Sequence, residues 1–134
     1  MATKKIMYVN RVTPHGGITA KESLDVVLIS AAFDQDVALA FIDDGVYQLL
    51  QDQQPEKIGS RNVAKSFAAL GDYDVRKIYV EQESLTERGL SEADLVDLRH
   101  ENPEDDYRDT ASIRFISREK LARLFSRQDV LFTF

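Results

Sequence analysis

The stretch from residue 37 to residue 42 constrains the fold most, because it is an unbroken apolar run without polar–apolar alternation. Such a strand is typical of a parallel sheet that helices cover on both faces. The run ends at the turn signal Asp43-Asp44-Gly45, and a short helix is predicted over residues 46–50. Open α/β sheets meet ligands and partners at the carboxyl ends of their strands, so this turn is the first place to look for function.

The remaining elements alternate in the same way along the chain. Thr19 and Glu22 form a capping box before an apolar periodicity of 3.6 residues. The pattern predicts further strands over residues 5–9, 75–81, 112–116 and 130–134. It predicts helices over residues 20–33, 62–70, 84–89 and 118–126. Residues 91–98 could form either a helical turn or a weak strand. Strand–helix alternation implies parallel pairing through right-handed crossovers. We expect a single-domain, flavodoxin-like, doubly wound α/β fold over residues 1–134, with a mostly parallel sheet of about five strands and helices on both faces.

The net charge of −6 is carried by one segment. Residues 92–109 hold eight acids and two arginines, so the rest of the chain is neutral. With Pro103 and few apolar residues, this segment is expected to be an exposed, mobile loop with a solvated His100. A pI near 4.9 and the lack of a basic stripe argue against direct binding of nucleic acid.

The chain has no cysteine, so the sequence excludes disulfides, thiolate metal sites and a thiol nucleophile. No apolar run approaches the roughly 20 residues that a membrane-spanning helix needs. The first residues lead into a strand and lack the apolar core of a signal peptide. These features predict a cytoplasmic protein.

The loop at residues 11–17 precedes a helix and contains His15 and Gly16. A helix amino terminus can bind an anion, yet neither dinucleotide nor Walker A glycine patterns are present, so a plain connection is favoured. His15 could act as an acid or base near neutral pH. Because no partner residue can be named, a structural or interface role is the preferred reading.

Asp43 and Asp44 are candidates for a magnesium site, since paired carboxylates at a strand end are suitable ligands. The alternative is that Asp44 and Gly45 only form a turn and that Asp43 caps the short helix that follows. We favour this alternative because no third metal ligand can be identified. The wide apolar face of the first helix and the apolar residues at 46–50 and 131–134 favour a protein that associates with others.

Several motifs together resemble the DsrE/DsrF-like sulfur-relay family, and within it the DsrF/TusC type of subunit. They span nearly the whole chain: Pro14-His15-Gly16, Phe41-Ile42-Asp43-Asp44-Gly45-Val46-Tyr47-Gln48-Leu49, Leu70-Gly71-Asp72-Tyr73, Ile78-Tyr79-Val80, Glu83-Ser84-Leu85 and Glu87-Arg88-Gly89-Leu90. The resemblance implies a subunit of a DsrEFH or TusBCD complex with two copies of each of three chains. Such complexes pass persulfide sulfur between proteins, for sulfur oxidation or for 2-thiouridine formation in tRNA.

The resemblance also implies partners of the DsrE/TusD and DsrH/TusB types. In the active subunit the sulfur-carrying cysteine lies at the end of the strand that corresponds to residues 78–81, where this chain has Tyr79, Val80 and Glu81. We therefore expect a non-catalytic subunit with no catalytic, cofactor or metal residues. The residues expected at an interface or a strand-end cleft are His15, Gly16, Asp43, Asp44, Tyr47, Tyr79 and Glu81.

Two alternatives stay open from the sequence. One is a flavodoxin-like protein that binds a small ligand or anion through residues 13–17 and Asp43 with Asp44. The other is an enzyme centred on His15 and Asp43.

Overall fold

The computed structural model describes residues 3–12, 25–27, 29–31, 33, 35–51, 67, 70–71 and 75–134. The expected loop with His15 and Gly16 lies outside the described residues, as does most of the helix expected over 62–70. Residues 25–27 and 29–31 are helical, in agreement with the helix expected over 20–33. Within the described ranges, no helix is long and apolar enough to cross a membrane.

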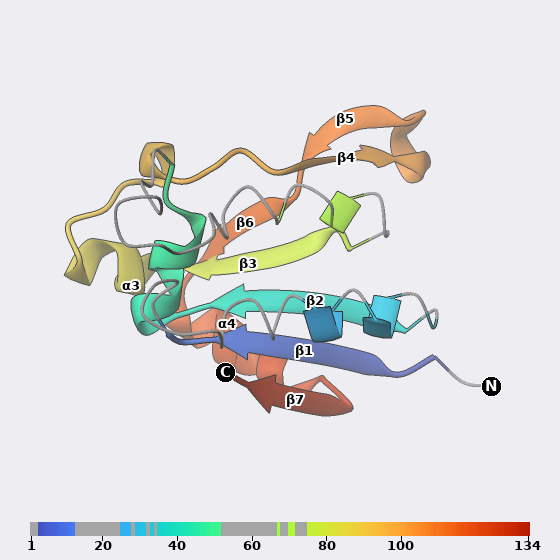
Figure 1. Ribbon diagram of the computed structural model, residues 1–134, viewed down its shortest axis with the longest axis horizontal. Helices are drawn as coiled ribbons and strands as arrows, with labels where there is room; N and C mark the ends of the chain where they lie inside the picture. Colours follow the sequence, from blue (N-terminus) through green and yellow to red (C-terminus); the bar gives the residue numbers. More distant parts are fainter. Residues whose placement is uncertain are drawn as a thin grey trace.

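The core of the fold is a five-stranded sheet in the order β6-β3-β2-β1-β7, and every neighbouring pair is parallel (Figure 1). The apolar run over residues 37–42, predicted as a strand covered on both faces, forms β2 at the middle of the sheet. The strands are β1 (Lys5–Asn10), β2 (Asp36–Phe41), β3 (Lys77–Glu81), β6 (Ile113–Ile116) and β7 (Val130–Thr133). The expected α/β class with a parallel five-stranded sheet is confirmed. The strand order differs from that of flavodoxin, because here the last strand, β7, lies beside the first, β1.

Each face of the sheet has its own apolar cluster. One contains Tyr8, Leu39 and Phe41 with Val27 of the first helical segment. The other contains Met7, Val9, Ala38, Ala40 and Tyr79 with Leu121 of α4 (Arg118–Ser126). Because successive side chains of a strand point to opposite faces, the apolar run of β2 contributes to both clusters. Helices on both faces make the sheet doubly wound, as expected.

At the end of β2 the chain turns into the 3-10 helix η1 (Asp43–Leu49), which includes the expected helical residues 46–49. Gly45 passes so close to β1 that an added Cβ would lie 1.9 Å from the carbonyl oxygen of Asn10. The buried Gln48 donates a hydrogen bond from Nε2 to the carbonyl of Val12 at 2.9 Å. The end of β2 is thus fixed against the end of β1.

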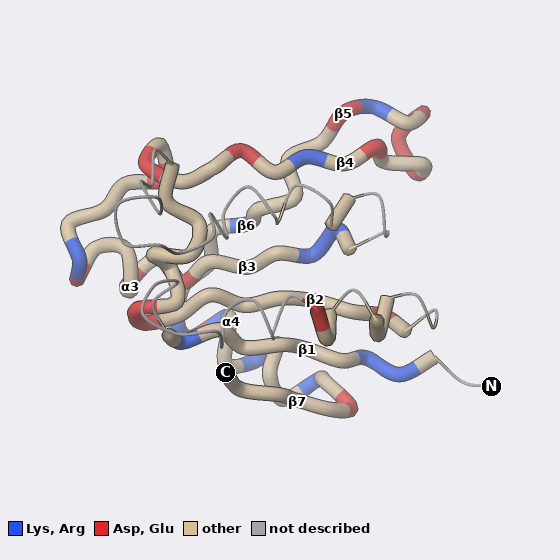
Figure 2. The backbone as a smooth tube through the Cα atoms, in the orientation of Figure 1, with Lys and Arg blue, Asp and Glu red and all other residues tan. Residues whose placement is uncertain are grey.

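The expected loop over 92–109 is exposed for most of its length, but its backbone is not a loop throughout. After the short η4 (Glu92–Asp94), this part of the chain forms an antiparallel hairpin of β4 (Arg99–Asn102) and β5 (Arg108–Ala111), joined through η5 (Pro103–Asp105). Figure 1 shows the hairpin beyond β6, and Figure 2 shows acidic residues along both its strands and its tip. The ion pair between Arg99 and Asp109 across the two strands, at 2.8 Å, stabilises a pairing that apolar patterning does not reveal.

His100 is also not solvated, contrary to expectation. It lies on β4 with 8% of its surface exposed, and its Nδ1 is 2.8 Å from the hydroxyl of the buried Ser112. Burial lowers the pKa of His100, and the positive charges of Arg76 and Arg114 add to this effect. The neutral imidazole is therefore a buried part of the hairpin strand β4.

Candidate functional site

The carboxyl end of β3 carries a buried carboxylate, that of Glu81, whose residue is 5% exposed. Its Oε1 accepts a hydrogen bond from the Ser84 hydroxyl at 2.6 Å. The same oxygen accepts from Nε and Nη2 of Arg118 at 3.1 and 2.9 Å. A buried carboxylate is costly without such donors, so the three contacts explain how this position tolerates a charge.

Arg118 joins α4 to this strand end. It is the first residue of the helix, its backbone N–H donates to both carboxylate oxygens of Glu83 at 2.9 and 3.0 Å, and its guanidinium reaches Glu87 at 2.8 Å. The hydrogen bonds that Arg118 donates to Glu81, and then to Glu87, raise the pKa of Arg118, which is therefore a permanent cation. One arginine thus pairs with a buried carboxylate of β3 and with an exposed one of the helix α3 (Gln82–Glu87).

Ser84 connects this cluster to the end of β2. The side chain is fully buried, and its hydroxyl oxygen accepts the backbone N–H of Asp43 at 2.8 Å while its proton goes to Glu81. Asp43 has a left-handed backbone, with φ of 50°, which aspartate tolerates better than most residues. The ends of β2 and β3 are therefore joined by one hydroxyl.

The carboxylates of Asp43 and Asp44 turn to different partners. Asp43 pairs with Arg11 at 3.1 Å, and Asp44 pairs with Arg88 at 3.1 Å. The described residues contain no group of three side chains suited to a metal ion, so the magnesium hypothesis gains no support. The expected cap is also wrong in detail, because the residue before η1 is Ile42 and no side chain caps this helix.

The remaining candidates do not meet at one point. Tyr47 is half-buried on η1, and Tyr79 is buried on the face of the sheet that α4 covers. His15 and Gly16 lie outside the described residues. Of the expected residues, the structure connects Asp43 and Glu81, because both are hydrogen-bonded to the Ser84 hydroxyl. Asp44 lies beside them, because it pairs with Arg88. Nη1 of Arg88 in turn donates to the Ser84 carbonyl at 3.1 Å.

Sequence reasoning missed three residues as parts of this site, namely Arg11, Ser84 and Arg118. Arg118 left a recognisable signal, because a cation in the first turn of a helix opposes the helix dipole and calls for another partner. Ser84 follows Glu81 by three residues, a spacing that puts the two side chains within reach once a helix begins between them. Arg11 gave no such signal.

Comparison with known proteins settles the family. The family model described as DsrE/DsrF-like matches residues 4–134. The chain belongs to the DsrE/DsrF-like family. It is 45% identical over 131 residues to the intracellular sulfur oxidation protein DsrF of Allochromatium vinosum, covering 98% of this chain and 96% of that protein.

A second similar protein is the TusC homolog of Vibrio parahaemolyticus. It is 40% identical over 92 residues, which cover 69% of this chain and 78% of the homolog. Among solved structures, the ychN protein from E. coli superposes with a TM-score of 0.75 over 98% of this chain and all of that chain. At 20% identity this similarity shows the fold alone.

The chemistry open to this member of the family is limited at the end of β3. Glu81 is engaged by three donors, and the chain has no thiol at this or any other position. Neither a carboxylate nor a phenol forms a persulfide, whereas a thiolate of tuned pKa does. The cluster holds strand ends in place and has no sulfur-carrying group.

Proposed function

We propose that this chain is a non-catalytic, cysteine-free subunit of a cytoplasmic sulfur-relay complex of the DsrEFH or TusBCD type. It serves sulfur oxidation or 2-thiouridine formation in tRNA by positioning partner subunits that carry persulfide. Membership of the family and 45% identity to DsrF over nearly the whole chain support this assignment.

One observation carries the proposal: Glu81 stands at the end of β3, where the active type of subunit is expected to hold its cysteine. The carboxylate is buried and bound to Ser84 and Arg118, so the position is filled by a structural ion pair. A chain with this arrangement contributes surface and geometry to a relay, while the partners contribute the thiols.

A subunit of this kind needs apolar surface for its neighbours, and one such surface is present. Ile29 of the first helical segment is 59% exposed, Phe33 in the turn after that segment is 71% exposed, and Phe132 on the edge strand β7 is 45% exposed. Tyr8 joins the two places, because its hydroxyl bonds to Ser30 and its ring stacks on that of Phe132 at 5.3 Å. We define Ile29, Phe33 and Phe132 as the apolar surface, and its exposure supports association.

The expected assembly is a hexamer with two copies each of this chain, a DsrE/TusD-like chain and a DsrH/TusB-like chain. Native mass spectrometry of the three co-expressed chains tests it, with this chain expressed alone as the control. A mass equal to two of each supports the proposal. A chain that stays at its own monomer or homo-oligomer mass in the presence of both partners contradicts it.

The non-catalytic role has its own test. When the assembled complex is loaded with isotopically labelled sulfane sulfur, the label should be recovered on a partner cysteine and never on this chain. Label stably bound to this chain, located by peptide mass spectrometry, would refute the role even if the hexamer forms.

A further inference from the structure

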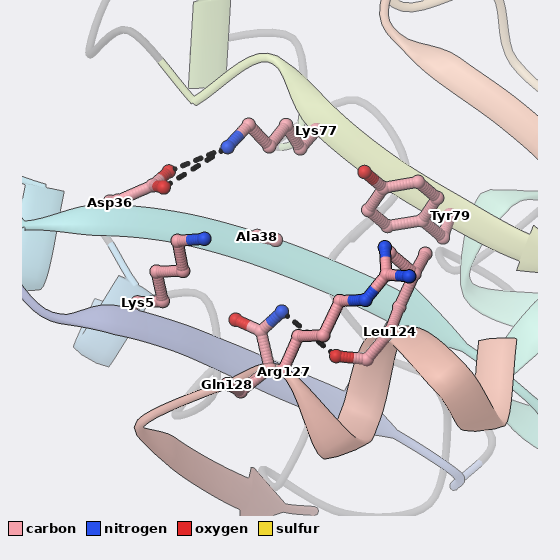
Figure 3. A pocket seen from close by; sticks show the side chains of 8 residues that line it. All are labelled: Lys5, Asp36, Ala38, Lys77, Tyr79, Leu124, Arg127 and Gln128. Atoms are coloured by element: carbon pink, nitrogen blue, oxygen red, sulfur yellow. Dashed lines mark hydrogen bonds and ion pairs between the residues drawn. The ribbon is translucent and has the colours of Figure 1, made fainter.

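A cavity of about 140 Å³ lies at the amino-terminal end of the sheet, opposite the Glu81 cluster (Figure 3). It is bounded by the starts of β1, β2 and β3 and by the carboxyl end of α4. The lining residues are Lys5, Asp36, Ala38, Lys77, Tyr79, Leu124, Arg127 and Gln128. Ala38 of β2 has the smallest side chain among these residues.

The cavity is positively charged although the chain is acidic overall. Lys5, Lys77 and Arg127 come from three separate parts of the fold, and Asp36 is the only carboxylate among the lining residues that the structure describes. The Lys77 ammonium lies 2.9 and 3.1 Å from the two oxygens of Asp36, which neutralises that carboxylate. The Lys5 ammonium and the Arg127 guanidinium have no ion-pair partner among the described residues, so two positive charges face the cavity in a chain of net charge −6.

The lining also presents hydrogen-bond donors. Figure 3 shows the Tyr79 hydroxyl and the Arg127 guanidinium within the group of lining side chains. The helix end would normally repel an anion through its free carbonyls. Here the Leu124 carbonyl is occupied twice, because it accepts the backbone N–H of Arg127 at 3.1 Å and Nε2 of Gln128 at 3.0 Å. A ligand in these surroundings has to be rich in acceptors and negatively charged.

The size of the cavity narrows the ligand further. A single water needs roughly 10–15 Å³ of such volume, so about 140 Å³ leaves room for a tetrahedral oxyanion with a hydrating water. Pockets for drug-sized ligands begin near roughly 300 Å³, about twice this volume, so a small anion matches the cavity better than a nucleotide or flavin does. We propose that this cavity binds a small tetrahedral oxyanion of the sulfate or phosphate class. The site is independent of the relay assignment, because it lies at the other end of the sheet and uses none of the Glu81 cluster.

Isothermal titration calorimetry of the full-length chain with sodium sulfate and with sodium phosphate tests the proposal, with sodium chloride holding the ionic strength constant. Saturable one-site binding of either anion is expected, and a preference identifies which one the site takes. Arg127→Gln and Lys5→Gln should each weaken binding at least roughly tenfold, the value of one charge-assisted hydrogen bond. Asp36→Asn should tighten binding, because it removes the carboxylate and releases Lys77.

Lys120→Gln is the matched control, since it removes the same charge from an exposed position of α4 outside the cavity lining. Its affinity should stay within about twofold of the wild type, and circular dichroism verifies that each variant is folded. The proposal is overturned if neither anion gives saturable heat with the wild type. It is equally overturned if Lys120→Gln weakens binding as much as Arg127→Gln, or if folded Asp36→Asn loses binding.

Discussion

Replacing Gly45 by alanine tests how tightly the ends of β1 and β2 are joined. In most exposed turns, Gly→Ala stabilises a protein by about 0.4–1 kcal/mol when the backbone permits it, because the unfolded chain loses freedom. Here the added Cβ would lie 1.9 Å from the oxygen and 2.5 Å from the carbonyl carbon of Asn10. Ordinary carbon–oxygen contacts are longer by more than 1 Å, so the backbone of one strand end has to move.

The magnitude follows from what that movement disturbs. The Asn10 carbonyl accepts the backbone N–H of Ile42 at 3.1 Å, and a lost hydrogen bond of this kind costs about 1 kcal/mol. Overpacking a tight site adds about 1–3 kcal/mol. We therefore expect Gly45→Ala to lower the free energy of unfolding by about 2–4 kcal/mol, a large share of the roughly 5–15 kcal/mol of a typical domain.

Equilibrium urea unfolding followed by circular dichroism measures this loss. The control is Gly89→Ala, where φ is +66° but an added Cβ meets nothing within 4 Å. It should cost only the left-handed backbone penalty of about 1–2 kcal/mol. The prediction is refuted if the free energy of unfolding of Gly45→Ala is within about 0.5 kcal/mol of the wild type, or if it falls less than that of Gly89→Ala. The close contact between Gly45 and the end of β1 would then not contribute to stability.

Three further outcomes are expected. Ser84→Ala should cost about 1–3 kcal/mol in urea unfolding, because the buried Glu81 and the N–H of Asp43 each lose a partner; an unchanged midpoint would contradict this. The pKa of His100 is lower in the folded chain, so on acidification the unfolded chain binds the proton first. The free energy of unfolding of the wild type should therefore be at its full value above pH 6.5 and fall below it. The free energy of unfolding of His100→Gln should fall less between pH 7 and pH 5.5. The double variant Ile29→Ser and Phe33→Ser should leave the melting temperature unchanged but reduce the hexamer fraction in native mass spectrometry, whereas Tyr107→Ser, equally exposed on the hairpin, should not.

The elements with strong local signals were predictable from the sequence. The unbroken run of β2 gave a buried central strand because both faces of that strand are covered. The helix over 118–126 agrees with α4 at both ends, since Ser117 accepts the N–H of Lys120 as an N-cap should. These signals depend only on residues that are close together in the sequence.

The hairpin and the Glu81 cluster were not predictable, because both depend on contacts between distant residues. β4 and β5 are polar strands whose pairing rests on each other, so no apolar alternation indicates them. His100 is hydrogen-bonded to Ser112, twelve positions away, and Glu81 accepts from Arg118, thirty-seven positions away. Acidic composition predicted exposure correctly for most of the segment, but it does not distinguish a loop from a ribbon.

The pairing of β1 with β7 bears on how the chain acquires its structure. Ile6 lies opposite Val130, so this part of the sheet forms only when residues more than a hundred positions apart meet. Parallel pairings of such large sequence separation are slow to form, because the loop-closure entropy is lost before the contacts compensate for it. During synthesis β7 leaves the ribosome after every other strand of the sheet. Until then one side of β1 is an open, apolar edge, and this interval is when the nascent chain is most exposed to aggregation.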